Sequence, residues 1–303
     1  MESVLITGGT GLIGKHLAKN LQVKGYKVGL LSRTGNPSSD IPVYVWEPDK
    51  NKIDNEAVSR ADYIIHLAGE GIGDKRWTKK RRQLILESRV KSCQLLFNAV
   101  RETGSGIKAF ITASGIGYYG SVTSEKIYHE ADHPGEDFIA KICMHWEKEA
   151  DRFEDCGIRT IKIRTGIVLA GEGGAMARMM TPVKIGIGSA IGNGRQYLPW
   201  IHIEDLCNIY SKAIEDKTLK GAYNAVAPDH KTNREFMQIL SSVLEKPFFT
   251  PGIPAIVLKV LFGEMSVILL KGSRISSERI MTAGYNFQFP ELVGALKDLL
   301  ISR

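Results

Sequence analysis

Three glycines near the start of the chain have the spacing of a turn that binds the phosphates of a dinucleotide. Gly8, Gly11 and Gly14 follow the apolar run Val4–Thr7 and open a segment with apolar residues at helical spacing. Such a turn lets the backbone approach a pyrophosphate, and the free N–H groups at the start of the helix attract the anion. The contacts that we expect from this turn are Gly8, Thr10, Gly11, Leu12, Ile13 and Gly14.

The residues after the next apolar run, Lys27–Ser32, favour NADP(H) over NAD as the dinucleotide. A site that prefers NAD usually places an acidic residue about 20 positions after the glycines, against the 2′-hydroxyl of the ribose. This chain has Ser32 and Arg33 there. A hydroxyl and a guanidinium suit a 2′-phosphate, which a carboxylate would repel. We therefore expect an NADP(H) site; the alternative is that Arg33 is only a surface cation.

Two more segments are expected to contact the cofactor. The tripeptide Leu67-Ala68-Gly69 ends an apolar run, and its small residues let the backbone pass close to a ligand. Arg89 lies on the apolar stripe of a helix predicted over residues 78–101. A buried charge without a partner is costly, so Arg89 contacts either a cofactor phosphate or an internal carboxylate.

The catalytic candidates follow the apolar run Ile107–Ala113. Ser114 is placed to hydrogen-bond a substrate oxygen, while Tyr118 or Tyr119 either donates a proton or forms a wall of the pocket. His66 lies inside an earlier apolar run and is predicted to be a hydrogen-bonded core histidine rather than a catalyst.

Most of these candidates stand at or just after the end of an apolar run, and these runs alternate with helical patterns. The predicted strands are Val4–Thr7, Lys27–Ser32, Val43–Trp46, Ala61–Ala68, Ile107–Ala113 and Ile158–Arg164, with a Pro/Ser-rich turn at Asn36–Ser39. This alternation predicts an α/β fold with a Rossmann-type doubly wound parallel sheet, which binds ligands at the carboxyl ends of its strands.

The chain is predicted to form two lobes. We assign residues 1–169 to the NADP-binding Rossmann domain, with a return of the chain to it at about 195–225. Residues 170–303 form mostly a small C-terminal α/β lobe that binds the substrate. Arg195, on the glycine turn Gly192–Gln196, is either a contact for an anionic substrate group or part of a surface hairpin.

Composition and charge restrict the class of protein. The 303 residues are 43% apolar and 24% charged, as in an ordinary soluble protein, and we expect no membrane partner. Four widely spaced cysteines predict reduced thiols, no metal site and a cytoplasmic location, and the apolar start of the chain is predicted to be a core strand rather than a signal peptide.

The net charge of +7 is concentrated in Lys75–Arg82, which we interpret as a solvated helix face. The alternatives for this run are attraction of a phosphorylated cofactor and, last, of nucleic acid, which we do not expect as a partner.

The chain resembles the extended short-chain dehydrogenase/reductase superfamily in the segments Thr7–Gly14, Leu67–Gly69 and Thr112–Gly120. Later motifs resemble one atypical subgroup, the "epimerase family" proteins: Ser88-Arg89-Val90, Gly117–Gly120, Arg164–Leu169, Pro199–Ile203, Tyr223–Pro228, Phe262–Met265, Gly284-Tyr285 and Phe289–Leu292. The resemblance implies a Rossmann domain, bound NADP(H) and a small C-terminal substrate lobe.

The same resemblance shows a departure in the expected acid/base pair. Superfamily members with ordinary chemistry carry Tyr-x-x-x-Lys on the helix after the fifth strand, where tyrosine is the acid/base. The helix predicted over Phe138–Asp155 has no tyrosine, and Ile139 and Cys143 stand at the two positions when counted back from Glu147. Ser114 matches the superfamily's active-site serine.

We therefore expect an NADP-dependent oxidoreductase or epimerase-like enzyme that acts on a small polar substrate through a non-standard proton donor. The candidates for this donor are Tyr118, Tyr119 and a water molecule near Ser114. The missing pair motivates an alternative, an NADPH-binding sensor or scaffold without turnover. The sequence leaves the substrate and a homo-oligomeric state open.

Overall fold

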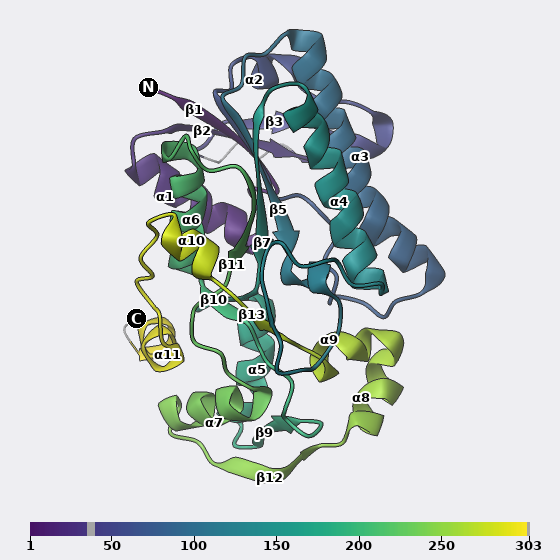
Figure 1. Ribbon diagram of the computed structural model, residues 1–303, viewed down its shortest axis with the longest axis vertical. Coiled ribbons are helices and arrows are strands. Elements are labelled where there is room, and N and C mark those ends of the chain that lie inside the picture. Colours follow the sequence, from purple (N-terminus) through teal and green to yellow (C-terminus); the bar gives the residue numbers. More distant parts are fainter. Residues whose placement is uncertain (35–39, 302–303) are drawn as a thin grey trace.

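A seven-stranded sheet forms the centre of the molecule (Figure 1). The computed structural model describes residues 1–34 and 40–301, so the turn expected at Asn36–Ser39 lies outside the described residues. The strands, in the spatial order β11-β7-β5-β4-β1-β2-β3, pair in parallel throughout. They are β1 (Ser3–Thr7), β2 (Lys27–Ser32), β3 (Val43–Val45), β4 (Tyr63–His66), β5 (Ala109–Gly115), β7 (Arg159–Thr165) and β11 (Gly221–Ala225). The order runs outward from β1 in both directions, which is the doubly wound arrangement predicted from the sequence.

Helices cover both faces of this sheet (Figure 1). One face carries α1 (Leu12–Val23) and α6 (Ile203–Glu215), and the other carries α2 (Asn55–Ser59), α3 (Lys79–Thr103) and α4 (Phe138–Asp155). Each face has its own apolar core: Ile6 packs with Leu17 of α1, while Leu5 packs with Leu96 of α3. Leu5 and Ile6 are consecutive in β1, so their side chains point to opposite faces of the sheet.

The other elements extend mostly beyond the carboxyl ends of the strands, and Figure 1 places α7, α8, β9 and β12 at the end of the molecule opposite α2. They are β6 (Ile127–Tyr128), β8 (Ile167–Leu169), α5 (Gly174–Lys184), β9 (Gly188–Ile191), β10 (Trp200–His202), α7 (Asn233–Val243), β12 (Phe248–Ile253), α8 (Ala255–Phe262), α9 (Val267–Leu270), β13 (Arg274–Ile275), α10 (Glu278–Thr282) and α11 (Leu292–Ile301). Short 3-10 helices are η1 (Pro48–Lys50), η2 (Ile116–Tyr119) and η3 (Gly263–Ser266). Within the described ranges, the helices are all too short or too polar to cross a membrane. The lobe boundary at residue 169 stays a prediction.

Two capped helices lie beside the carboxyl ends of the strands. The Thr78 hydroxyl accepts a hydrogen bond from the backbone N–H of Arg81 and caps α3. The Asp137 carboxylate caps α4 by accepting from the N–H of Ala140, and it also accepts from the N–H of Ser121. Caps satisfy N–H groups that the first helical turn leaves free, so these side chains fix where each helix begins.

Candidate functional site

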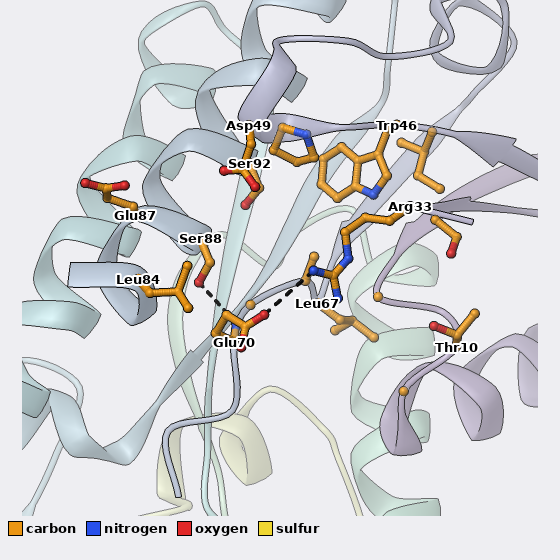
Figure 2. Close-up of a pocket in the computed structure, with 17 residues that line it drawn as sticks. Thr10, Arg33, Trp46, Asp49, Leu67, Glu70, Leu84, Glu87, Ser88 and Ser92 are labelled. Atoms are coloured by element: carbon orange, nitrogen blue, oxygen red, sulfur yellow. Dashed lines mark hydrogen bonds and ion pairs between the residues drawn. The ribbon is translucent and has the colours of Figure 1, made fainter. Parts of the chain in front are cut away.

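A cavity of about 330 Å³ opens at the carboxyl ends of β1, β2 and β4 (Figure 2). Its lining brings together most of the predicted cofactor contacts, namely Gly8, Thr10, Gly11, Ser32, Arg33, Leu67, Ala68 and Gly69. Sequence reasoning missed the lining residues Trp46, Asp49, Glu70, Ser88 and Ser92. Three of these could have been found from their positions in the sequence. Glu70 directly follows the tripeptide Leu67-Ala68-Gly69, and Ser88 and Ser92 flank Arg89 on α3. Of the remaining cofactor candidates, Leu12 and Gly14 are not in this lining, whereas Ile13 and Arg89 line a second cavity.

The glycine turn is tightly packed against the backbone of Leu67-Ala68, directly after β4. Gly8 has φ of +68°, which favours glycine, and a Cβ there would lie 3.0 Å from the backbone of Leu67 and Ala68. A Cβ on Gly14 would lie 2.5 Å from Gly9 Cα, so a side chain there would collide with backbone that cannot move aside. The turn itself closes through a hydrogen bond from the N–H of Gly11 to the oxygen of Gly8 (3.0 Å). No described side chain therefore covers the backbone of Gly8 and Gly11 on the side of the cavity.

A buried chain of hydrogen bonds ties β1, β4 and α3 together beneath the cavity. Thr7 Oγ1 accepts from the N–H groups of Leu67-Ala68, so its own proton goes to His66 Nδ1 (2.7 Å). His66 Nε2–H then donates to Ser92 Oγ (3.1 Å), which donates to the backbone oxygen of Arg89 (3.0 Å). Burial, helped by the charge on Arg89, lowers the pKa of His66 to about 3. His66 is thus the neutral, hydrogen-bonded core residue that the sequence predicted.

Arg33 lies at one side of the first cavity. Figure 2 shows its side chain extending below Trp46 toward Glu70, and its guanidinium lies 3.7 Å from one carboxylate oxygen of Glu70. The other carboxylate oxygen of Glu70 accepts a hydrogen bond from Arg81 at 2.8 Å. Arg33 is mostly exposed, so its ion pair with Glu70 contributes little stability and leaves the guanidinium available to another anion. Ser32 lies beside it in the same lining.

In the basic run Lys75–Arg82, Lys75, Arg76, Lys79 and Lys80 are exposed, as expected for a solvated face, whereas Arg81 and Arg82 are partly buried. Arg81 is largely buried and pairs with Glu70, as described above. Arg82 pairs with Glu264 of η3 and lies over the ring of Phe138. The run therefore joins the start of α3 both to the first cavity and to the C-terminal elements.

A second cavity, of about 510 Å³, shares Leu67 with the first one and extends past β5 toward α4 and α9. Ser114 and Arg89 line it, together with Ile139 and Cys143, the two residues at the positions of the family's acid/base pair. Isoleucine is the commonest residue of its lining, and its aliphatic residues include Ile13, Ile72, Ile116, Ile142, Ile167, Val168, Ile268 and Ile275. This lining differs from that expected for a small polar substrate.

Neither position of the missing pair holds a group that exchanges protons near neutral pH. Ile139 packs over Gly117, where a Cβ would collide with the Ile139 side chain. Burial raises the pKa of the Cys143 thiol to about 12. Apolar packing thus occupies the surface of α4 that carries the acid/base pair in the superfamily.

Ser114 is held by a buried ion pair. Its Oγ donates to the carboxylate of Glu147 at 2.7 Å, and Arg164 donates two hydrogen bonds of 2.8 Å to the same carboxylate. Burial opposes the charge of Arg164, but the Glu147 carboxylate outweighs this effect and raises the pKa of the guanidinium. The Ser114 hydroxyl therefore donates its proton to Glu147, and the lone pairs of Ser114 Oγ can accept a hydrogen bond from a ligand.

The two tyrosines predicted as catalytic candidates lie away from both cavities. Tyr119 is 2% exposed; its hydroxyl donates to Asn224 (2.7 Å) and accepts from Arg164 (3.0 Å). Burial raises the pKa of Tyr119 to about 12. The Tyr118 ring packs against the Arg164 guanidinium, whose Cζ lies 3.4 Å from the ring centre. Neither ring lines the first or the second cavity of the described structure, because the η2 turn points both rings toward Arg164. This geometry argues against their expected roles as proton donor or pocket wall.

Arg195 also lies apart from the cleft. It lines a separate surface cavity with Thr232, Arg234 and Pro251, near β9 and β12. The structure therefore does not place it beside Ser114, as its predicted substrate role requires. The lysine at the edge of the second cavity is instead Lys271, which directly follows α9.

Comparisons with known proteins cover nearly the whole chain. Residues 4–225 match the NAD dependent epimerase/dehydratase family, and residues 253–299 match a domain of unknown function, DUF1731. The chain is 37% identical to epimerase family protein SDR39U1 of Mus musculus, over 98% of this chain and 99% of that protein. It is 33% identical to epimerase family protein YfhF of Bacillus subtilis (strain 168), over 99% of both chains.

Solved structures show the same relationship. The crystal structure of human epimerase family protein SDR39U1 (isoform2) with NADPH has a TM-score of 0.87 and 33% identity, and the match covers 98% of each chain. UDP-N-acetylglucosamine 4-epimerase from Bacillus cereus has a TM-score of 0.80 at 16% identity, over 99% of this chain and 98% of that one, which shows a likeness of fold. The resemblance found in the sequence motifs is therefore confirmed, and the chain belongs to the NAD dependent epimerase/dehydratase family, among its SDR39U1-like epimerase family proteins.

Proposed function

We propose that the chain is an NADP(H)-dependent, epimerase-like oxidoreductase that acts on a small molecule. The observation that carries this proposal is the first cavity, where the glycine turn and Arg33 lie on the same opening at the carboxyl edge of the sheet. The human relative, 33% identical, was solved with NADPH, which supports the same cofactor for this chain.

The residues of the first cavity suit the phosphates of NADP(H). Gly8, Thr10 and Gly11 would hold the pyrophosphate, because the glycines have no side chain to keep the anion from the backbone N–H groups. Ser32 and Arg33 would hold the 2′-phosphate, since Arg33 is exposed and only weakly paired with Glu70. The acids in this described lining are Asp49, Glu70 and Glu87, and none of them stands directly after β2, where an NAD site places its ribose-binding acid.

The residues of the second cavity suit a substrate beside the nicotinamide, which supplies or accepts a hydride when bound. Ser114 would accept a hydrogen bond from a substrate or water hydroxyl, because its own proton is held by Glu147. The aliphatic lining would exclude bulk water from the reacting atoms. We propose that a water molecule at Ser114, rather than Tyr118 or Tyr119, exchanges the proton with the substrate.

Binding of the two nucleotides tests the proposal. We expect the protein to bind NADPH more tightly than NADH, and Arg33→Ala to weaken NADPH binding about tenfold or more with little effect on NADH, because only NADPH has the 2′-phosphate. Nucleotide fluorescence titrations measure both affinities. Arg101→Ala, at an exposed arginine near the far end of α3, is the control and should change neither. An unchanged NADPH/NADH affinity ratio in Arg33→Ala would contradict the 2′-phosphate assignment.

The second candidate is an NADPH-binding sensor without turnover. Ile139 and Cys143 favour it, because they place no proton donor at the usual position. Absorbance of NADPH in the presence of aldehydes, ketones and nucleotide sugars separates the two candidates. Consumption with any of them supports the oxidoreductase, and tight binding without consumption across the set supports the sensor.

We also propose a cytoplasmic location. Its support is the state of the cysteines: Cys93, Cys143 and Cys207 are buried free thiols, and Cys156 is an exposed one. Proteins of oxidising compartments usually pair such residues.

A further inference from the structure

Two buried hydrogen-bond donors beside the second cavity lack an acceptor. Arg89 is 6% exposed and lines this cavity, and its Nε has no hydrogen-bond partner among the described residues. The indole Nε1 of Trp146, also buried and in the same lining, is equally without a partner in the described chain. The two side chains are neighbours, because Arg89 Cζ lies 4.9 Å from the centre of the Trp146 ring. Since buried donors are nearly always hydrogen-bonded, this pair indicates a ligand that brings an acceptor.

The charge of Arg89 has no counter-ion. One terminal nitrogen donates to the backbone oxygens of Glu70 and Ile85 at 3.0 Å, and no carboxylate of residues 1–34 and 40–301 forms an ion pair with the guanidinium within 4.0 Å. The Glu70 carboxylate instead pairs with Arg81 and Arg33. Burial lowers the pKa of Arg89 to about 10, which still leaves the group charged at neutral pH. The internal salt bridge that the sequence left open is therefore absent from the described structure, and a buried charge of this kind calls for an anion.

The rest of the cavity limits what this anion is attached to. None of the described lining residues is Asp, Glu or His, so nothing there repels a negative charge. Lys271 adds a second cation at the edge, and it forms no ion pair within the described ranges. The remaining lining carries the hydroxyl groups of Ser114, Ser121, Thr165, Tyr197 and Ser273, but most of its surface is apolar, with Ile72 and Ile268 on the side toward α9. Hydrocarbon surface favours an apolar body and disfavours a bare polyhydroxylated sugar, whose hydroxyls would lose their water.

We propose that the ligand of the second cavity is a small apolar carboxylate, whose carboxylate is bound by Arg89 and Trp146 and whose hydrocarbon part lies against the isoleucines. A carboxylate offers two acceptor oxygens in one plane, which suits neighbouring guanidinium and indole donors. Arg89 lines this cavity, and its guanidinium also lies beside Gly69 of the first cavity. We assign Arg89 to the substrate, and the NADPH affinity of an Arg89 variant tests this assignment. The proposal rests on the proposed function in taking this ligand as the substrate of an NADP(H) enzyme.

Calorimetric titration of the full chain saturated with NADP⁺ tests this proposal. The probes are 4-methylpentanoate, hexanoate and 3-phenylpropanoate, each compared with its own primary amide. We expect the acids to bind at least about tenfold more tightly than the amides, which is the loss of one charge-assisted hydrogen bond. Arg89→Met should weaken acid binding by about tenfold or more and change NADPH affinity by less than about threefold. Trp146→Phe keeps the ring and should weaken the acids alone, and Arg101→Met on the same helix is the matched control.

Each result of these titrations either supports or overturns the proposed carboxylate ligand. Equal binding of acids and amides, or no binding of any acid, overturns the proposal. So does an Arg89→Met protein that loses NADPH affinity as strongly as acid affinity, because the anion would then belong to the cofactor. If Arg89→Met does not fold, the acid–amide comparison in the unaltered protein and the Trp146→Phe titration still decide. Failure of the unaltered protein to bind NADPH would contradict the proposed function instead, and it leaves acid binding to be measured without nucleotide.

Discussion

His66 is held in a single protonation state by two hydroxyl groups. Thr7 donates to one ring nitrogen and Ser92 accepts from the other, and the surrounding core excludes water. A charged imidazolium would have to donate to Thr7, whose hydroxyl oxygen already accepts from the backbone N–H groups of Leu67 and Ala68, directly after β4. The neutral form is therefore part of the structure that connects β1 to α3 under the cofactor cavity.

This arrangement predicts a dependence of stability on pH. The pKa of His66 is lowered to about 3 in the folded state, whereas an unfolded histidine has a pKa near 6.5. Between these values the unfolded chain binds more protons, so acidification from pH 7 to pH 5 should cost about 2 kcal/mol of unfolding free energy through this residue. Urea denaturation at the two pH values measures the change. His66→Gln should be less stable at pH 7 but should lose that much less on acidification; an unaltered pH dependence in this variant would refute the assignment.

The positions of some site residues are determined by the local sequence, and those of others by packing against distant parts of the chain. Gly8, Gly11 and Arg33 follow apolar strands directly, and strand ends of a parallel sheet meet at one edge, so their placement in one lining could be predicted. Tyr119 and Arg195 depend on how a short turn and a distant hairpin pack, which no local pattern encodes. Tyr119 turns inward because Arg164 and Asn224, far along the chain, bind its hydroxyl.

At the scale of the element, the boundary between β1 and α1 depends on close contact between backbones. The helix begins directly after the turn, and the missing side chain at Gly14 lets it approach Gly8 and Gly9. The strand–turn–helix pattern was predictable because it is periodic and local. The short η2 helix, by contrast, was not predicted, and it is the element that turns Tyr118 and Tyr119 toward Arg164.

Gly14→Ala should therefore disturb the turn and the nucleotide site together. A methyl group there meets backbone atoms at 2.5 Å or less, so we expect a loss of about 1–3 kcal/mol in stability and markedly weaker NADPH binding. Gly106→Ala is the matched control, because no atom lies within 4 Å of its Cβ position and its φ is not positive. Thermal denaturation and NADPH titration of both variants measure the effect. Equal behaviour of the two variants would show that the close packing at Gly14 is unimportant.

At the scale of the whole molecule, Asp205 joins the C-terminal segment to the main α/β layers. This buried carboxylate of α6 accepts hydrogen bonds from the Tyr285 hydroxyl (2.6 Å) and from the N–H groups of Gln288 and Phe289 (2.8 and 3.0 Å). The overall architecture was predictable from the alternation of strands and helices. This connection was not, because it brings together residues about eighty positions apart in a segment without periodic pattern.

Removal of this carboxylate should weaken the whole fold. We expect Asp205→Ala to lower the free energy of unfolding by about 3 kcal/mol, because the buried Tyr285 hydroxyl and two partly buried N–H groups lose their charged acceptor. Asp155→Ala, an exposed acid at the end of α4, should change it by less than about 0.5 kcal/mol. Urea denaturation of the two variants provides the measurement. A small loss in Asp205→Ala would mean that water replaces the carboxylate at the three donors.

The uncompensated charge of Arg89 has a consequence for the protein without its ligand. Burial of that guanidinium away from water lowers the stability of the folded state, and a bound anion would offset this cost by pairing with the charge. A ligand that neutralises Arg89 should therefore raise the melting temperature by more than its small contact area suggests, because binding to the native state alone shifts the folding equilibrium. Heat resistance then becomes a reporter of occupancy, and a library of acids can be screened against this chain before its reaction is known.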